Sequence, residues 1–285
     1  MAIVSRMTNT LRAILHMLNH HRNHLSDMMP SANRMNDMGR SCEQFIKDIF
    51  SELPSDSDEQ TKLLRYAEVF SYSGNQNHPP DLILKNGDAI EIKKIESRSP
   101  NLALNSSYPK HKLYATNKRI LASCKNCEST PWDVKDIVYV IAHAKDKKIN
   151  SLWMIYGDCY AASPETYERI HNLISENVYA SEDIDFIETN ELAKIQKIDP
   201  LGITDLRVRG MWSIAHPSKV FAYLEIPHQQ EFSIYALMCK EKYLCFTPED
   251  RTTLEQHPHA QVRHVLIKNP DNPVQLLDAV LIVAL

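Results

Sequence analysis

The sequence has no apolar run long enough to span a membrane, and it does not open with a secretory signal peptide. Its first residues, MAIVSRMTNTLRAILHMLNHH, are too polar and too rich in histidine for the apolar region of such a signal. Apolar residues recur there at helical spacing, which predicts an amphipathic helix that carries Leu11, Ile14, Leu15 and Leu18. We therefore expect a protein without a membrane partner and a cytoplasmic location.

A zinc-binding pattern of cysteines is also missing. Among six cysteines, only Cys124 and Cys127 form a CxxC pair, and no second pair follows at zinc-finger spacing. Cys239 and Cys245 lie too far along the chain to complete a four-ligand set, so we expect free thiols. A group of histidines with i, i+4 spacing consists of His16, His20, His21 and His24. A solvent-facing polar helix explains that group better than a metal site.

A net positive charge, which many nucleic-acid-binding proteins carry, is absent, because the formal net charge is −4. The distribution is nevertheless uneven. Residues 85–125 include nine Lys or Arg against three Asp or Glu, a net charge of +6, whereas acidic residues gather elsewhere, as in SELPSDSDEQ. Binding to a phosphate backbone requires such a local basic stripe. The alternative is a solvated loop surface.

The chain shows no internal repeat and no disordered linker long enough to divide it. We therefore predict a single domain of residues 1–285, a length that suits one large domain. Within it we distinguish an N-terminal helical part (1–53), a sheet core (65–160) and a C-terminal part (199–285).

Hydrophobic periodicity predicts helices before and after a central sheet. Helical patterns cover residues 8 to about 53, interrupted near Pro30, and residues 163–178. The helix that ends near residue 53 has an apolar side that we expect to face a core. This side consists of Cys42, Phe45, Ile46, Ile49 and Phe50. Strand patterns occupy residues 65–72, 82–84, 89–92, 136–144, 149–160, 220–225, 232–239 and 277–283. The predicted class is α/β, with a mixed central β-sheet flanked by helices and additional C-terminal strands.

The segment HPPDLILKNGDAIEIKK, residues 78–94, predicts a β-hairpin that turns at Asn-Gly. We expect a loop with an odd number of residues centred on Gly87. That register pairs Leu84 with Ile90, Ile83 with Glu91, Leu82 with Ile92, and Asp81 with Lys93. The large aliphatic side chains other than Ile83 then share one face. The other face gathers Asp81, Glu91 and Lys93.

These three charged residues suit one kind of chemistry. Two carboxylates a few ångströms apart repel each other when ionised, unless a cation lies between them. Mg²⁺ prefers oxygen ligands and is commonly held by one or two carboxylates with water and substrate phosphate. On the same face, Lys93 is placed to orient or deprotonate an attacking water. Such a set is typical of phosphodiester hydrolysis by in-line attack. The alternative is a hairpin edge that faces solvent.

Pro80-Asp81, nine further residues and Glu91-Ile92-Lys93 resemble the PD-(D/E)xK nuclease signature. Two other segments are LALNSSYPKHKLYATNKRIL (102–121) and DPLGITDLRVRGMWSIAHP (199–217). They resemble type II restriction endonucleases of the NgoPII type, which cut within GGCC. The resemblance spans about residues 38–235 and leaves the first and last segments unplaced. Many nucleases share the signature, so the two flanking segments carry the narrower resemblance.

The resemblance implies a restriction-endonuclease-like core that cuts both strands of DNA with Mg²⁺ at a short palindromic site. It implies a catalytic set of Asp81, Glu91 and Lys93, in which the two carboxylates hold the metal. The main-chain carbonyl of Ile92 is an expected further ligand. Glu43, on the helix before the hairpin, is a candidate third carboxylate, although a helix-surface role explains it as well. Expected partners are a second subunit in a homodimer and a matching DNA methyltransferase that protects the host genome.

Two segments offer candidate DNA-binding residues. The segment after the hairpin contains residues that could contact phosphates or bases, namely Asn105, Ser106, Ser107, Lys110 and Lys112. A later basic and aromatic segment offers Arg207, Arg209, Trp212 and His216. Arg207 and Arg209 have strand spacing, so both can project into a major groove, where arginine is the preferred reader of guanine. The alternative is a pair of salt-bridged surface arginines.

Two further functions stay open from the sequence. A metal-dependent nuclease of repair or recombination would recognise the structure of DNA rather than its sequence. A non-catalytic DNA-binding module would keep the fold without the chemistry, although the intact catalytic set speaks against it. Cleavage of plasmid DNA separates the three, since they produce discrete bands, a smear or no products.

Overall fold

The computed structural model describes residues 7–21, 23–25, 34–75, 78–179, 191–196, 198–201, 203–227 and 232–284. The helices are α1 (Thr10–His20), α2 (Arg34–Phe50), α3 (Glu59–Val69), α4 (Ala122–Lys125), α5 (Gly157–Tyr160), α6 (Pro164–Tyr179), α7 (Pro217–Val220), α8 (Lys240–Cys245) and α9 (Pro248–Glu255). A 3-10 turn follows α7 at Ala222–Leu224. Within these described ranges, no helix has both the length and the apolar character needed to cross a membrane.

The strands form one large sheet and two small ones. The large sheet contains β1 (Phe70–Asn75), β2 (His78–Leu84), β3 (Ala89–Ile95), β5 (Lys112–Tyr114), β6 (Val134–Lys145), β7 (Lys148–Tyr156), β11 (Ser233–Cys239), β12 (Ala260–Lys268) and β13 (Leu276–Ala284). Its strand order is β1-β2-β3-β6-β7-β11-β13-β12, and β5 pairs with β6. The small sheets pair β4 (Leu102–Asn105) with β10 (Trp212–Ile214), and β8 (Ala193–Ile195) with β9 (Leu206–Val208).

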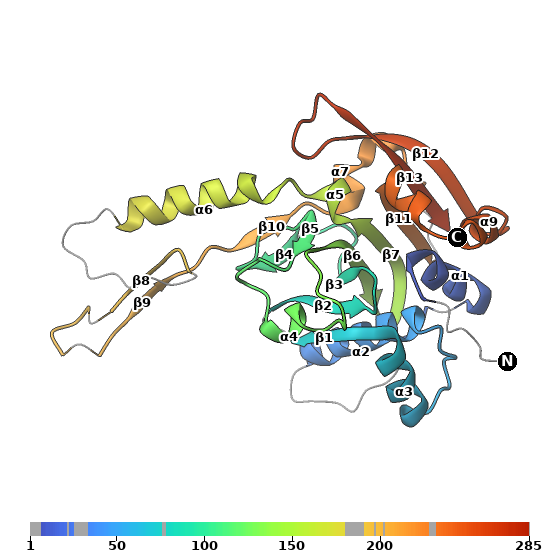
Figure 1. Cartoon of the computed structure of the whole chain (residues 1–285), viewed down its shortest axis with the longest axis horizontal. Helices are drawn as coiled ribbons and strands as arrows, with labels where there is room; N and C mark the ends of the chain where they lie inside the picture. Colours follow the sequence, from blue (N-terminus) through green and yellow to red (C-terminus); the bar gives the residue numbers. More distant parts are fainter. Residues whose placement is uncertain are drawn as a thin grey trace.

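The large sheet is mixed, because β3 runs parallel to β6 and β11 runs parallel to β7, while the other described pairs of its strands are antiparallel. Helices lie against it, and the last strands extend it at one edge (Figure 1). The predicted mixed α/β sheet with flanking helices and C-terminal strands is therefore confirmed.

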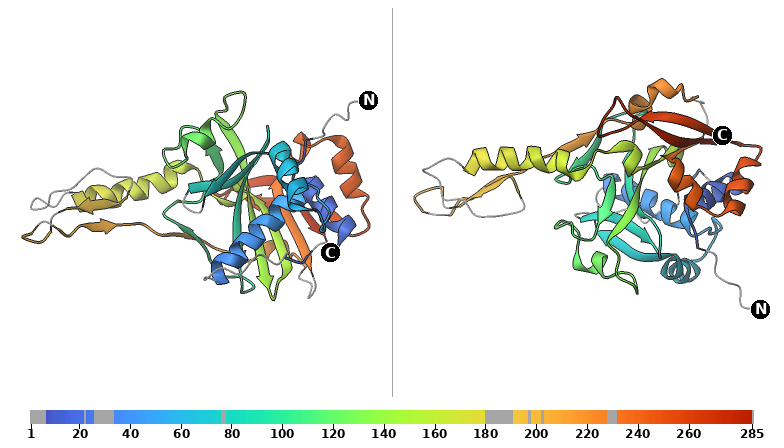
Figure 2. Two further views of the ribbon diagram at one scale, coloured as in Figure 1. Left: turned by 90° about the horizontal axis from the view of Figure 1, so that it is seen from below. Right: turned by 45° about the horizontal axis from the view of Figure 1, so that its top comes forward.

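One face of this sheet is covered by α1 and α2. The predicted apolar stripe of α2 is buried there, and consists of Cys42, Phe45, Ile46, Ile49 and Phe50. It shares one hydrophobic cluster with Leu82, Leu84 and Ile90 of the hairpin. At the other end of the chain, α9 packs against α1, where Asn9 Nδ2 donates to Asp250 Oδ2 at 2.9 Å (Figure 2). The two ends of the chain thus complete the same layer.

Truncation of Ile49 tests how much this layer stabilises the protein. Ile49 is fully buried in the cluster, so Ile49→Ala removes apolar contacts and leaves a cavity. We expect the free energy of unfolding, measured by urea denaturation, to fall by about 2–5 kcal/mol. The matched control is Leu63→Ala on α3, since Leu63 is 66% exposed and its loss should change stability by less than about 0.5 kcal/mol. Equal effects of both variants would contradict the assignment.

The opposite face holds a second cluster. The sheet contributes Ile83, Leu113 and Tyr139, and the covering segments contribute Leu102, Leu104, Ile120 and Phe221. These segments come from residues 102–120 and from the region of α7. The second face therefore lies under the two stretches of sequence that were expected to touch DNA.

The hairpin between β2 and β3 has a register other than the predicted one. The observed partners are Leu82 with Ile90, Ile83 with Ala89, and Leu84 with Asp88, whose main-chain oxygen accepts from Leu84 at 2.9 Å. The odd-numbered loop is confirmed, but its centre is Asn86 and not Gly87. Asn86 adopts a left-handed φ of 56°, which asparagine tolerates better than most residues.

The two-residue error leaves the faces unchanged, because side chains alternate with a period of two. Leu82, Leu84 and Ile90 lie in the first cluster, whereas Ile83 lies in the second. The predicted division of the hairpin into an aliphatic and a charged face is therefore confirmed.

Two other predicted strands, at 65–72 and 149–160, are wrong in part, and the one predicted at 220–225 is wrong. Residues 65–69 belong to α3, which begins where Asp58 accepts from the main-chain N–H of Thr61 at 2.9 Å. Residues 220–225 form the end of α7 and a 3-10 turn, after His216 caps the helix. The strand expected at 149–160 ends at Tyr156, and α5 follows. In each case a local capping or turn interaction outweighs an apolar pattern.

A long arm projects from the compact part of the molecule. It consists of α6 together with the β8–β9 hairpin, and every view shows it extending away from the sheet (Figures 1 and 2). Ser175 Oγ of α6 donates to the main-chain oxygen of Leu192 at 2.8 Å, which ties the two parts together. None of the residues of α6 is buried.

Candidate active site

Neighbouring strands bring Asp81, Glu91 and Lys93 together. Asp81 lies on β2, and its Oδ2 accepts from the main-chain N–H of Ile92 on β3 at 2.6 Å. Glu91 and Lys93 alternate on β3, and the Lys93 ammonium donates to Glu91 Oε1 at 2.8 Å. The hairpin therefore holds two carboxylates and one ammonium in a single half-buried group.

The charges of this group are not balanced by its own members. Burial raises the pKa of Asp81 above its ordinary value, and the charge of Glu91 raises it further. Burial lowers the pKa of Lys93, but Glu91 outweighs that effect and the net shift is upward. Glu91 Oε2 is buried and has no hydrogen-bond partner in the part of the chain that the structure describes. A hard divalent cation fits these oxygens, since it would satisfy Oε2 and relieve the repulsion between the carboxylates.

Glu43 approaches this group from α2. Its charge contributes to the raised pKa of Asp81, although it ranks behind burial and Glu91. Glu43 also forms an i, i+4 ion pair with Lys47 at 2.8 Å, as a residue on a helix surface does. Both expected roles of Glu43 thus have support in the contacts.

Lys94 lies on the other side of β3 from Lys93. Burial raises the pKa of Cys42 on α2 to about 12, and the charge of Lys94 opposes that rise. Lys94 therefore faces α2, and its ammonium pairs with Glu96 at 2.5 Å. This placement makes Lys94 a matched control for Lys93.

Tyr139 is part of the site, although the sequence analysis assigned it no function. It is the register partner of Glu91 on the adjacent parallel strand β6, so the two side chains share a face. Its hydroxyl accepts from the main-chain N–H of Lys110 at 2.7 Å. The signal in the sequence is one hydroxyl in the otherwise aliphatic stretch IVYVIA (137–142).

Through Tyr139, Lys110 comes within electrostatic reach of Glu91. Lys110 is 4% exposed, and its ammonium donates to Ser107 Oγ at 2.7 Å. Burial lowers its pKa to about 8, and the charge of Glu91 opposes that shift. The contacts place Lys110 and Ser107, both expected at DNA, beside the candidate catalytic group.

The two segments expected to touch DNA meet in the small β4–β10 sheet. Asn105 pairs there with Trp212, although 107 positions separate them in the sequence. The Trp212 ring lies edge-on to Tyr108 and Tyr167, with centroids 6.2 and 5.6 Å away. Beside Asn105, Ser106 is exposed. This small sheet therefore presents candidate contacts from both segments at one place.

Lys112 and His216 lie in other surroundings. The Lys112 ammonium pairs with Asp136 at 2.6 Å, within an ion network of the core. His216 is 1% exposed, and its Nδ1 accepts from the main-chain N–H of Ser218 at the start of α7. These contacts give both residues structural roles in the described molecule.

Arg207 and Arg209 lie on and beside β9 in the arm. Both guanidinium groups pair with the carboxylate of Glu191, at 2.7 and 2.5 Å. They are 55% and 51% exposed, so solvent reaches both side chains. Arg207 and Arg209 thus have the expected strand spacing. They also form the surface salt bridge that was the alternative to a role in reading bases.

Comparisons with known proteins show the family of this chain. A family model described as NgoPII restriction endonuclease matches residues 8–269. The type II restriction enzyme NgoPII of Neisseria gonorrhoeae is 40% identical over 276 residues, which cover 96% of this chain and 98% of that enzyme. The chain belongs to the NgoPII restriction endonuclease family. No solved structure matches the chain.

As a member of the NgoPII family, the protein is a type II restriction endonuclease, which is a site-specific deoxyribonuclease. The family match is longer than the resemblance noted from the sequence, which covered about residues 38–235. It also includes α1, α8 and α9, which complete the layer on the first face of the sheet. Enzymes of this type typically need a divalent metal ion.

Proposed function

We propose that this NgoPII-family enzyme cuts both strands of DNA within GGCC in a Mg²⁺-dependent reaction. The observation that carries the catalytic part is the group of Asp81, Glu91 and Lys93, with the buried Glu91 Oε2 left without a partner. The sequence GGCC is what the resemblance to NgoPII-type enzymes implies.

In this proposal, Asp81 and Glu91 hold the ion, and the main-chain carbonyl of Ile92 completes the protein ligands. Glu43 is a further carboxylate near Asp81. Mg²⁺ supplies charge neutralisation at the scissile phosphate. Lys93, fixed by its hydrogen bond to Glu91, positions the attacking water.

Contacts with DNA are proposed on the same side of the sheet. The small β4–β10 sheet, where the two candidate segments meet, contributes Asn105, Ser106 and Trp212. Ser107 and Lys110 lie beside Glu91 and serve the region of the scissile phosphate. A basic side chain with no carboxylate partner among the described contacts, such as Lys110, suits a phosphate oxygen.

A digest of one sequenced plasmid tests the cleavage specificity. We expect discrete fragments that map to GGCC, and no fragments when cytosines in those sites are methylated. A host with this enzyme then needs a methyltransferase that modifies the same sites. A smear would favour a nuclease without sequence specificity, and fragments that map to another sequence would reject GGCC while leaving the catalytic proposal intact.

The arm supports a homodimer, because it exposes apolar side chains on a surface that nothing in the described chain covers. Leu201 is 80% exposed and Ile203 is 78% exposed, near the tip of the arm. A two-fold dimer with one active site per strand is the simplest arrangement for cutting a palindrome. The exposed apolar tip suits contact with a second protein chain better than contact with phosphates.

Sedimentation with a GGCC duplex tests the dimer. We expect two chains per duplex at saturation. Leu201→Ser should shift the equilibrium toward one chain, because it removes apolar surface from the proposed contact. Val274→Ser, at a 91% exposed position between β12 and β13, should leave the stoichiometry unchanged. One wild-type chain per duplex would contradict the dimer.

A further inference from the structure

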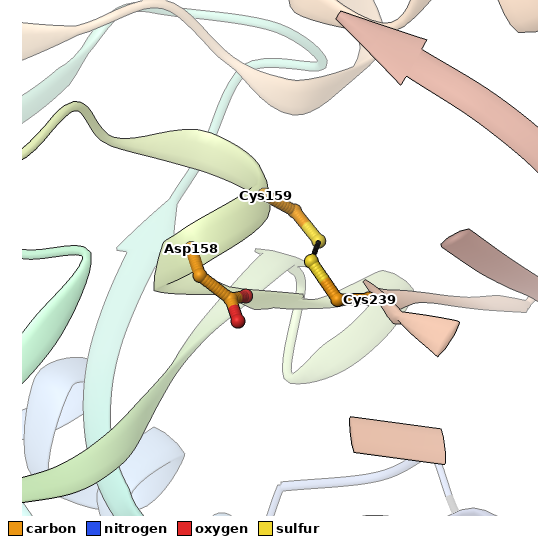
Figure 3. A group of neighbouring side chains, drawn as sticks. All are labelled: Asp158, Cys159 and Cys239. Atoms are coloured by element: carbon orange, nitrogen blue, oxygen red, sulfur yellow. Dashed lines mark hydrogen bonds between the residues drawn. The ribbon is translucent and has the colours of Figure 1, made fainter. Parts of the chain in front are cut away.

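A second group of metal-binding side chains lies away from the catalytic carboxylates. Asp158 and Cys159 come from α5, and Cys239 ends β11 (Figure 3). Their ligand atoms all lie within 4.8 Å of one another, and the two sulfur atoms are 3.5 Å apart. All six cysteines are free thiols, as expected, but the fold makes neighbours of two that are 80 positions apart.

The carboxylate of this group forms no ion pair with the residues that the structure describes. Burial raises the pKa of Asp158, whereas the charge of Lys112 and hydrogen bonds with the two thiols oppose that rise, and Oδ1 is buried without a hydrogen-bond partner among the described residues. The Lys112 ammonium itself belongs to an ion network, in which it pairs with Asp136 at 2.6 Å. In the same network, Lys242 pairs with Asp136 at 2.9 Å and with Asp88 at 2.6 Å. Asp158 therefore shares the charge of Lys112 with Asp136, and a bound cation would neutralise it directly.

The chemistry of the donors selects the kind of cation. Two thiolates and one carboxylate suit a borderline-soft ion such as Zn²⁺, whereas Mg²⁺ avoids sulfur. With Zn–S bonds of about 2.3 Å, tetrahedral geometry separates two sulfur ligands by roughly 3.8 Å. The observed 3.5 Å separation requires only a small adjustment to reach that value.

We propose that Asp158, Cys159 and Cys239 form a second metal site for Zn²⁺ or a cation of the same class. Binding converts both thiols to thiolates and releases two protons to solvent. One tetrahedral position is left for water.

The bound ion would hold α5 against the sheet at the point where α5 contacts the main chain of Lys110. Gly157, which starts α5, packs so closely that a Cβ there would lie 2.4 Å from the main-chain oxygen of Lys110 and 2.5 Å from that of His111. Cys159 is two residues further along α5, and Cys239 is the last residue of β11. A metal ion bound to both would link α5 to β11. An ion at this point therefore supports the backbone that carries Lys110.

Titration of the metal-free, reduced protein with Co²⁺ tests the proposal. We expect one equivalent to produce the near-ultraviolet absorption of a cobalt–thiolate bond, and Zn²⁺ to displace it. Oxygen ligands at Asp81 and Glu91 produce no such absorption. Cys239→Ser should weaken this binding by more than about 10–100-fold, the loss that changes in outer-shell partners alone can cause.

Asp158→Asn provides a second variant of nearly the same shape, and it should also weaken binding. The matched controls are Cys245→Ser, at an exposed thiol six positions from Cys239, and Cys127→Ser in the CxxC pair. Both should bind Co²⁺ like the wild type. No thiolate absorption in the wild type, or equal absorption in Cys239→Ser, would overturn the proposal. The titration uses no DNA, so its outcome is independent of the proposed cleavage.

Discussion

Asp81→Ala and Lys93→Ala are each expected to lower the rate of cleavage by on the order of 10³-fold or more, while DNA binding stays largely intact. Asp81→Ala removes one of two carboxylates that face each other across the hairpin. Lys93→Ala removes the ammonium that Glu91 holds at 2.8 Å. The measurements are single-turnover cleavage of a cognate duplex and duplex affinity without divalent cations.

Lys94→Ala is the matched control for Lys93. The two lysines are adjacent in sequence, but Lys94 pairs with Glu96 and faces α2. Its loss should change the cleavage rate by a few-fold at most. Cleavage near the wild-type rate by Asp81→Ala or Lys93→Ala, or an equal loss in Lys94→Ala, would refute the assignment of roles.

The hairpin shows why the grouping of Asp81, Glu91 and Lys93 was predictable from the sequence. A strand has a side-chain period of two, so the alternation of Ile90, Glu91 and Ile92 determines which residues share a face. The exact partners depend on the loop, and the left-handed conformation of Asn86 moved its centre by one residue. The prediction of the faces tolerated that error because a shift of two residues returns every side chain to its own face.

Contacts between residues that are far apart in the sequence, in contrast, leave no local pattern from which they could be predicted. Lys110 is an ordinary lysine in a basic stretch, and only its contact with Tyr139 places it beside Glu91. Cys159 and Cys239 meet because β7 and β11 are adjacent in the sheet. The expected strand at 65–72 failed for a different reason, since the Asp58 cap favours a helix that continues to Val69.

Arg207→Ala is expected to reduce cleavage at GGCC by roughly 5- to 150-fold, the equivalent of 1–3 kcal/mol for one bidentate contact with guanine. Non-specific binding at low salt should fall little. Arg209→Ala should act in the same way if both arginines read bases. The measurement compares cleavage of GGCC duplexes with affinity for unrelated duplexes over a range of salt concentrations.

Glu191 determines how this experiment is read, because its single carboxylate pairs with both guanidinium groups. Contact with guanine requires at least one arginine to leave that salt bridge. Glu191→Gln should therefore leave the preference for GGCC in place and strengthen binding to DNA of any sequence. If Arg207 and Arg209 touch only phosphates, each alanine variant will instead weaken binding evenly across sequences, with a shallower dependence on salt. That result would assign the arm to the DNA backbone and move the search for base contacts to Asn105 and Trp212.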